Sequence, residues 1–175
     1  MRDDNLRMIV EAGILIALGY ILSMIKIWQA PMGGSVTAGS MIPIMLFALR
    51  WGHKKGIMIA VVYGGVQFML GPKWSYHPVS IIFDYFVAFG ALGIVGMFRK
   101  NHKQMILGVF LAIFVRYVAH VISGVVVFAS YAPETMSPTI YSLVYNSQYL
   151  IPEFIVSAVV FVLLYKPLKQ NKLLN

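Results

Sequence analysis

Long apolar segments recur along this chain and constrain its fold more than any other feature. An α-helix needs about 20 such residues to cross the hydrocarbon core of a bilayer. Hydrophobic residues make up 59% of the sequence and charged residues only 11%, whereas soluble domains carry about 25% charged residues. We therefore expect an integral membrane protein. The four clearest segments are 8–27, 79–98, 104–129 and 148–165.

Two shorter apolar segments, 39–50 and 56–70, lie between the first two long ones. They contain Pro43 and the pair Gly64–Gly65, residues that weaken or bend helices. We expect bent or incomplete helices there, because neighbouring helices can shield such interruptions from lipid. The sequence thus predicts an all-α membrane protein with six transmembrane helices, forming a single integral membrane domain over residues 1–175.

The placement of lysine and arginine tests this count independently of hydropathy. With six spans, two of these residues (Lys26 and Lys73) fall on one side of the membrane, and Arg116 lies inside a span. The other side holds Arg2, Arg7, Arg50, Lys54, Lys55, Arg99, Lys100, Lys103, Lys166, Lys169 and Lys172. Cytoplasmic loops carry the excess of Lys and Arg, so both termini are predicted to be cytoplasmic. The net charge of +8 then reflects membrane topology, and we expect no nucleic-acid partner.

Several kinds of site are missing from the sequence. It has no cysteine, which excludes disulfides and thiolate metal sites. It also has no phosphate-binding loop, no HExxH motif and no nucleophile elbow. Glu11 and the lack of a small-residue cleavage site argue against a cleaved signal sequence in the first segment. We therefore expect a binding protein without catalytic residues, metal or cofactor.

Ionisable residues nevertheless interrupt the predicted spans. Asp84 lies about two turns below the outer surface, at 1.5 Å per residue. His120 lies roughly 13 Å below that surface, with Arg116 one turn deeper on the same helix face. A charge in hydrocarbon costs several kcal/mol unless it faces partners or water, so we expect one cavity that opens outward. The sixth span adds polar residues in its outer half: Asn146, Gln148 and Glu153.

The outer connections are rich in aromatic residues and poor in charge. The segment 28–39 has three glycines and can fold inward over a ligand. The segments 71–78 and 130–141 supply further rings to the rim: Trp74, Tyr76, Tyr131 and Tyr141. Rings beside a buried carboxylate suit a flat organic cation, because each cation–π contact contributes about 0.5–2 kcal/mol.

Structural interpretations of the buried groups remain open. Asp84 could form an ion pair with Arg116. His120 could be a packing residue bonded to Tyr117 or to a backbone carbonyl. Glu153 follows a proline, as at the start of a helix, where the helix dipole favours a carboxylate.

A cavity without an energy source requires a partner protein. Gly13 and Ala17 are separated by three residues on the first segment, and this small-xxx-small spacing permits close helix contact. Gly19 and Ser23 repeat the spacing on another face. We predict that Gly13 and Ala17 dock the partner, although these small residues could also pack within the six-helix domain.

Five stretches of sequence, taken together, point to one family. They are the first segment with its small-xxx-small spacing, GGSVT followed by SMIPIMLFALRWG, HPVSIIFDYFVAFGALGIVG, RYVAHVISGVVVF, and YSLVYNSQYLIPE. With them, the whole chain resembles the thiamine-specific substrate-binding subunits (S-components, the ThiT or YuaJ family) of energy-coupling factor (ECF) transporters. The resemblance implies six helices with the vitamin bound in the outer half, under the connection between the first two.

The resemblance also implies a function, a partner and a site. The chain would capture thiamine from outside and deliver it inward with an ECF module, made of a coupling transmembrane subunit plus two ATPases, in the plasma membrane of a Gram-positive bacterium. The implied substrate-binding residues are Asp84, Tyr85, His120, Asn146, Tyr141, Trp74, Phe128 and Arg116. Two alternatives remain: an S-component for another vitamin or a thiamine precursor, and an intramembrane enzyme using Asp84 and His120 as acid and base.

Overall fold

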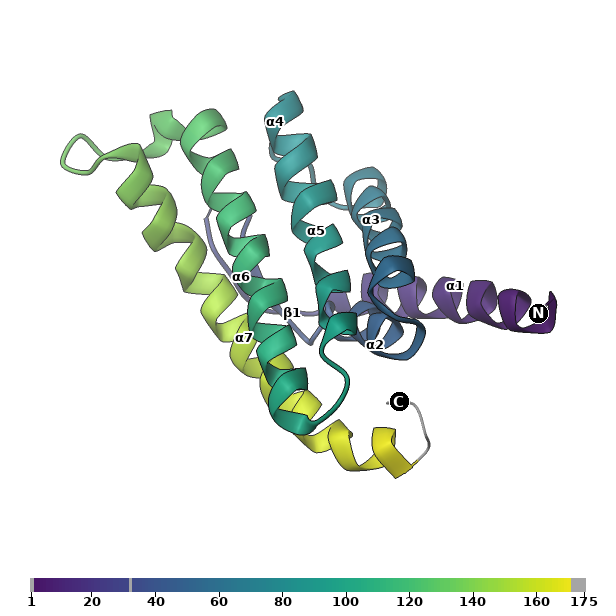
Figure 1. Ribbon diagram of the computed structural model, residues 1–175. Helices are drawn as coiled ribbons and strands as arrows, with labels where there is room; N and C mark the ends of the chain where they lie inside the picture. Colours follow the sequence, from purple (N-terminus) through teal and green to yellow (C-terminus); the bar gives the residue numbers. More distant parts are fainter. Residues whose placement is uncertain (1, 32, 171–175) are drawn as a thin grey trace.

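The computed structural model describes residues 2–31 and 33–170, so Lys172 of the predicted charge pattern lies outside the described residues. Six helical segments of ten residues or more follow one another along the chain, as predicted, with a short helical turn η3 (Ala129–Tyr131) between the last two (Figure 1). Five of them are single helices: α1 (Arg2–Met24), α2 (Ile42–Trp51), α3 (His53–Leu70), α6 (His102–Val127) and α7 (Pro138–Gln170). The fourth is a composite of α4 (Pro78–Ser80), η1 (Ile81–Val87), α5 (Ala88–Gly90) and η2 (Ala91–Met97). By length and composition, α1, the composite helix, α6 and α7 can each cross a membrane.

The boundaries differ from the prediction in places that matter for the site. α7 begins at Pro138 rather than at 148, so the segment 138–147, about three turns, is helix and not loop. α2 has only ten residues, as expected for an incomplete helix. α3 is instead one continuous helix of 18 residues. Gly64 lies inside this helix without interrupting it. Because glycine has no side chain, α3 can approach the backbone carbonyl of Tyr85 closely at this position.

The composite fourth helix changes its winding along its length. His77 caps its start by accepting a hydrogen bond from the Val79 N–H at 3.2 Å, and Pro78 supplies a backbone angle suited to the first turn. The wider π-helical turns of η1 follow, a form that is frequent at functional sites. Further along, Gly93 lies against the backbone of Gly56, so the composite helix and α3 pack closely.

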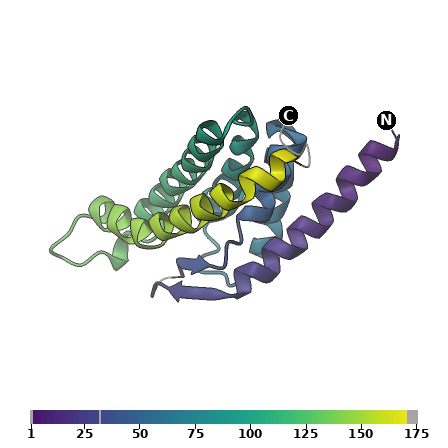
Figure 2. The same cartoon turned by 90° about the horizontal axis from the view of Figure 1, so that it is seen from below.

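The helices form one bundle with α1 at its edge. α6 packs against α7 and against the composite helix, which packs against α3 on its other side (Figure 1). α1 lies along α2 and α3 and leaves most of its surface exposed (Figure 2). The start of α1 and the end of α7 lie on the side opposite to the connection between α6 and α7 (Figure 2). This arrangement agrees with an even number of membrane spans.

The connection between α1 and α2 contains a small β-hairpin that the sequence analysis did not predict. β1 (Lys26–Gln29) pairs antiparallel with β2 (Ser35–Thr37), with an irregularity between Lys26 and Trp28. β1 is exposed along its whole length, whereas Val36 and Thr37 of β2 are buried. The hairpin thus presents an inner strand to the bundle and an outer strand to the surroundings.

Candidate functional site

A cavity of about 520 Å³ lies between the hairpin, the composite helix, α6 and α7. Glu153 lines it, whereas Gln148, placed at the same level by the sequence, does not. All eight residues predicted to bind substrate line this one cavity: Trp74, Asp84, Tyr85, Arg116, His120, Phe128, Tyr141 and Asn146. The structure therefore brings together side chains that are up to 72 positions apart in the sequence.

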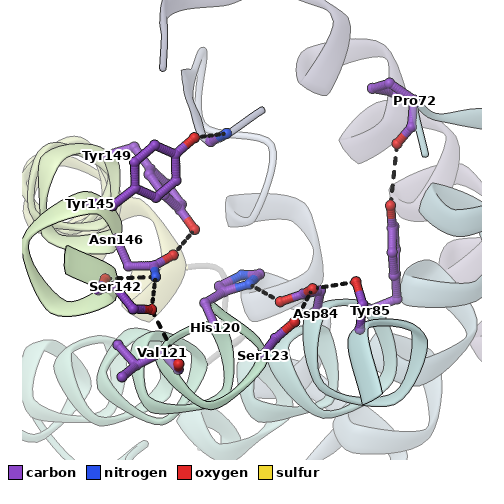
Figure 3. Close-up of polar contacts among 12 residues, drawn as sticks. Pro72, Asp84, Tyr85, His120, Val121, Ser123, Ser142, Tyr145, Asn146 and Tyr149 are labelled. Carbon is purple, nitrogen blue, oxygen red and sulfur yellow. Dashed lines mark hydrogen bonds and ion pairs between the residues drawn. The ribbon is translucent and has the colours of Figure 1, made fainter. Parts of the chain in front are cut away.

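Asp84 is the centre of a hydrogen-bond network between the composite helix and α6 (Figure 3). Its Oδ1 lies 2.8 Å from His120 Nδ1. Its Oδ2 accepts hydrogen bonds from the hydroxyls of Ser80 at 2.6 Å and Ser123 at 2.5 Å. Ser80 lies four residues before Asp84 on the same face of its helix. The carboxylate is therefore held by its surroundings while part of it faces the cavity.

The structural alternative for Asp84, an ion pair with Arg116, is wrong. Arg116 lies instead over the ring of Phe89, with its guanidinium carbon 4.0 Å from the ring centre. Its Nε and Nη1 are buried and find no hydrogen-bond partner within the described part of the chain. Arg116 thus contributes a positive charge to the cavity wall without neutralising Asp84 directly.

His120 offers its second ring nitrogen to the cavity region. Nδ1 is engaged by Asp84, while Nε2 is buried and has no partner among residues 2–31 and 33–170. The alternative that His120 bonds to Tyr117 is wrong, because the Tyr117 hydroxyl donates to the Leu143 carbonyl at 3.0 Å. The contact with Asp84 fixes the orientation of the imidazole and leaves Nε2 available to a ligand.

α7 contributes a face of tyrosines together with Asn146 (Figure 3). Asn146 Nδ2 donates to the Ser142 carbonyl at 2.8 Å, and its Oδ1 accepts from the Tyr149 hydroxyl at 2.5 Å. The rings of Tyr141 and Tyr145 are stacked, with 6.0 Å between their centres. Because Asn146 is bonded on both sides, its amide is held in a single orientation at the wall.

Aromatic side chains complete the rim on the other elements. The Tyr85 hydroxyl donates to the Pro72 carbonyl at 3.2 Å, which ties the composite helix to the preceding loop (Figure 3). Trp74 lies against the backbone of Gly33 and is about half exposed. Phe128 ends α6. These rings come from three different segments and face one cavity.

Glu153 does not occupy the start of a helix, because α7 continues through it. It is 3% exposed, and its Oε1 accepts hydrogen bonds from the Thr37 N–H at 2.6 Å and the Thr37 hydroxyl at 2.7 Å. The Thr37 hydroxyl also lies 2.8 Å from the Ser40 hydroxyl. Glu153 thus belongs to the cavity wall and contacts the hairpin, a pairing that sequence reasoning did not foresee.

The sequence analysis also missed several lining residues. Tyr145 and Tyr149 line the cavity on α7, and the successive spacing of four residues from Tyr141 places all three on one helix face. That spacing was a usable signal. Ser80, four residues before Asp84, was another. The contact with Thr37 carries no comparable signal, since it joins segments that are 116 positions apart.

The sequence profile described as thiamine transporter protein (Thia_YuaJ) matches residues 9–173. The chain belongs to this family. The match covers almost the whole chain. The protein is accordingly a membrane transport component and not an enzyme.

Named relatives are found among bacterial members of the thiamine transporter family. Thiamine transporter ThiT from Bacillus subtilis (strain 168) is 40% identical, with 94% of this chain and 93% of that protein covered. Thiamine transporter ThiT from Lacticaseibacillus paracasei is 25% identical, with 83% and 80% covered. The chain is thus similar along nearly its full length to the former.

Two solved structures share the fold of this chain. ThiT from Listeria monocytogenes superposes with a TM-score of 0.83 at 24% identity, covering 98% of each chain. The S component of a bacterial ECF transporter superposes with a TM-score of 0.66 at 20% identity, covering 95% of this chain and 97% of that one. The predicted S-component fold is therefore confirmed.

The two residues predicted to dock a partner lie away from the cavity. Gly13 and Ala17 are exposed on α1, and a side chain at Gly13 would meet open space. Gly19 packs instead against the Ser40 carbonyl and the ring of Tyr63. Packing within the domain is thus the correct interpretation for Gly19, whereas the Gly13 and Ala17 face is free for another helix.

Proposed function

We propose that this chain is the high-affinity thiamine-binding S-component of an ECF importer. It captures thiamine from the outer side of the membrane and delivers it inward with a separate energising module. The observation that carries the proposal is the hydrogen-bonded Asp84 carboxylate inside an aromatic cavity. Family membership supports it independently.

The chemistry of the cavity suits a flat organic cation. Thiamine carries a fixed positive charge on its thiazolium ring and an aminopyrimidine with hydrogen-bond donors. The acidic side chains that line the cavity are Asp84 and Glu153, and the buried basic one is Arg116. With a neutral imidazole, these three groups sum to one negative charge. Binding of a single cation therefore neutralises the buried part of the site, which matters because charges interact strongly at low dielectric.

Each predicted residue has a distinct role in this proposal. Asp84 accepts hydrogen bonds from the aminopyrimidine and offsets the thiazolium charge. His120 and Asn146 orient the ligand with polar atoms that their own hydrogen bonds hold in place. Arg116 sets the charge balance from the cavity wall. The remaining four residues flank the ligand rings: Tyr85, Trp74, Phe128 and Tyr141.

We further propose the assembly and location. The partner is an ECF module composed of a coupling transmembrane subunit and two ATPases, which docks on the α1 face around Gly13 and Ala17. Residues 1–175 form a single integral membrane domain in the plasma membrane of a Gram-positive bacterium. The similarity to ThiT from Bacillus subtilis supports this host.

Isothermal titration of the purified, detergent-solubilised protein with thiamine tests the proposal. We expect tight one-to-one binding of thiamine and no heat from riboflavin or biotin. Binding of riboflavin or biotin instead would assign the cavity to another vitamin. No binding of thiamine by protein with the helical circular-dichroism spectrum of the folded state would overturn the proposal.

A further inference from the structure

We propose that Glu153 is a positioning residue that ties the connection between α1 and α2 to α7 and thereby holds the roof of the cavity in place. The hairpin side of this connection lines the cavity with Gly33, Gly34, Ser35 and Thr37. The inference deepens the proposed function, because it explains how bound thiamine is retained. It assigns to Glu153 a role distinct from contact with the ligand.

The contact itself is short, double and buried. One carboxylate oxygen of Glu153 receives both the backbone N–H and the hydroxyl of Thr37, at 2.6 and 2.7 Å. Thr37 is 5% exposed and Glu153 is 3% exposed. Hydrogen bonds to a charged acceptor are stronger than neutral ones, and both residues are buried. The end of β2 is therefore held to the middle of α7.

A second contact between the hairpin and α7 lies two helical turns away. The Gly34 N–H donates to the Tyr145 hydroxyl at 3.3 Å (Figure 3). Tyr145 and Glu153 are eight residues apart and share one face of α7. The inner side of the hairpin is thus attached at two levels, and the contact at Glu153 is the charged one.

The outer side of the hairpin shows why this attachment matters. All four residues of β1 are exposed, and β1 pairs with β2 as its neighbouring strand. An isolated two-stranded hairpin is only marginally stable. Contacts of the hairpin with α7 therefore help to hold it over the cavity.

A buried carboxylate in a membrane helix is costly, so a role in packing alone would be served better by an apolar side chain. The Oε2 atom of Glu153 is buried and has no hydrogen-bond partner within the described residues. Arg116 lines the same cavity and interacts electrostatically with Glu153 without forming an ion pair. This positive charge favours a carboxylate at Glu153, whose Oε1 holds Thr37.

Spin-label distances test the tether, and the absence of native cysteines makes the labelling specific. Labels go on the exposed positions Ile27 of β1 and Ile140 of α7, as Ile27→Cys and Ile140→Cys. The distance distribution is measured by double electron–electron resonance in the parent, Glu153→Ala, Glu153→Gln and Thr37→Val. Ser157→Ala is the matched control, because Ser157 is buried one turn further along α7 and does not line the cavity.

We expect a broader distance distribution in Glu153→Ala and Thr37→Val, and partial restoration in Glu153→Gln, whose amide oxygen still accepts. Thiamine should dissociate about 10-fold or more faster from Glu153→Ala, as the loss of charged hydrogen bonds implies. Ser157→Ala should match the parent in both measurements. If Glu153→Ala does not fold, the distance distribution and the thiamine dissociation rate of Thr37→Val test the tether instead.

An unchanged distance distribution in the folded variants would overturn the tether, even with faster dissociation, because Glu153 would then act on the ligand. A parent protein that does not bind thiamine would refute the proposed function, while the distance measurements would still decide the role of Glu153. The two proposals therefore fail by different observations.

Discussion

Asp84 and His120 are joined by a contact of 2.8 Å between Oδ1 and Nδ1, which links η1 of the composite helix to α6. With the hydroxyls of Ser80 and Ser123 on the other oxygen, the carboxylate has three hydrogen-bond partners in the protein itself. Its position therefore does not depend on the ligand. Preorganisation of this kind reduces the cost of ordering the site on binding.

Replacement of Asp84 by alanine should weaken thiamine binding most. We expect the binding free energy to fall by about 2–4 kcal/mol in Asp84→Ala, because a buried charged hydrogen bond is lost. Isothermal titration measures the change. Glu11→Gln is the control, since Glu11 pairs with Arg50 at 3.1 Å outside the cavity and should bind like the parent. Parent-like affinity in Asp84→Ala would refute the central assignment.

The support given to Asp84 by α6 can be removed separately. Ser123→Ala deletes the hydroxyl that lies 2.5 Å from Asp84 Oδ2. We expect a loss of about 1–3 kcal/mol in binding free energy, because the Asp84 carboxylate oxygen that accepts this hydrogen bond loses its donor. Ser147→Ala serves as control, since the Ser147 hydroxyl donates to the Val144 carbonyl and does not line the cavity. Equal titration curves for the two variants would contradict this prediction.

The orientation of Asn146 depends on the Tyr149 hydroxyl. Tyr149→Phe preserves the ring but removes the donor to Asn146 Oδ1. Affinity for thiamine should fall by about 1–2 kcal/mol, as expected when a buried acceptor is left unpaired. Tyr117→Phe removes a hydroxyl bonded to the Leu143 carbonyl, outside the cavity. It should leave the titration unchanged, and a similar loss in both variants would point to a general effect on packing.

The two small-residue positions of α1 should respond oppositely to leucine. In Gly13→Leu the new side chain enters open space, so folding and thiamine binding should persist while assembly with the ECF module is lost. In Gly19→Leu it would meet the Ser40 carbonyl and Tyr63, which should destabilise the fold by about 1–3 kcal/mol. Thermal unfolding and co-purification with the module separate these effects. Normal assembly of Gly13→Leu would place the docking face elsewhere.

The sequence alone predicted the six helices, because apolar length and the distribution of Lys and Arg depend on the bilayer and not on how helices pack. It also predicted the shared cavity, since depth along a helix follows from residue spacing and a buried charge needs polar surroundings. Asp84, Arg116, His120, Asn146 and Glu153 meet at one cavity for this reason, whereas the full set of eight came from the family resemblance. The hairpin was missed, because strands of four and three residues leave little alternation to recognise.

Only the tertiary structure decided which groups pair. The sequence allowed an ion pair between Asp84 and Arg116. In the structure Asp84 instead contacts His120 and Ser123, while Arg116 lies over the ring of Phe89. Glu153 meets Thr37 across 116 positions. Sequence spacing sets the height of each side chain along its helix. The rotation of one helix against another, set by the packing of many side chains at their interface, determines the partner.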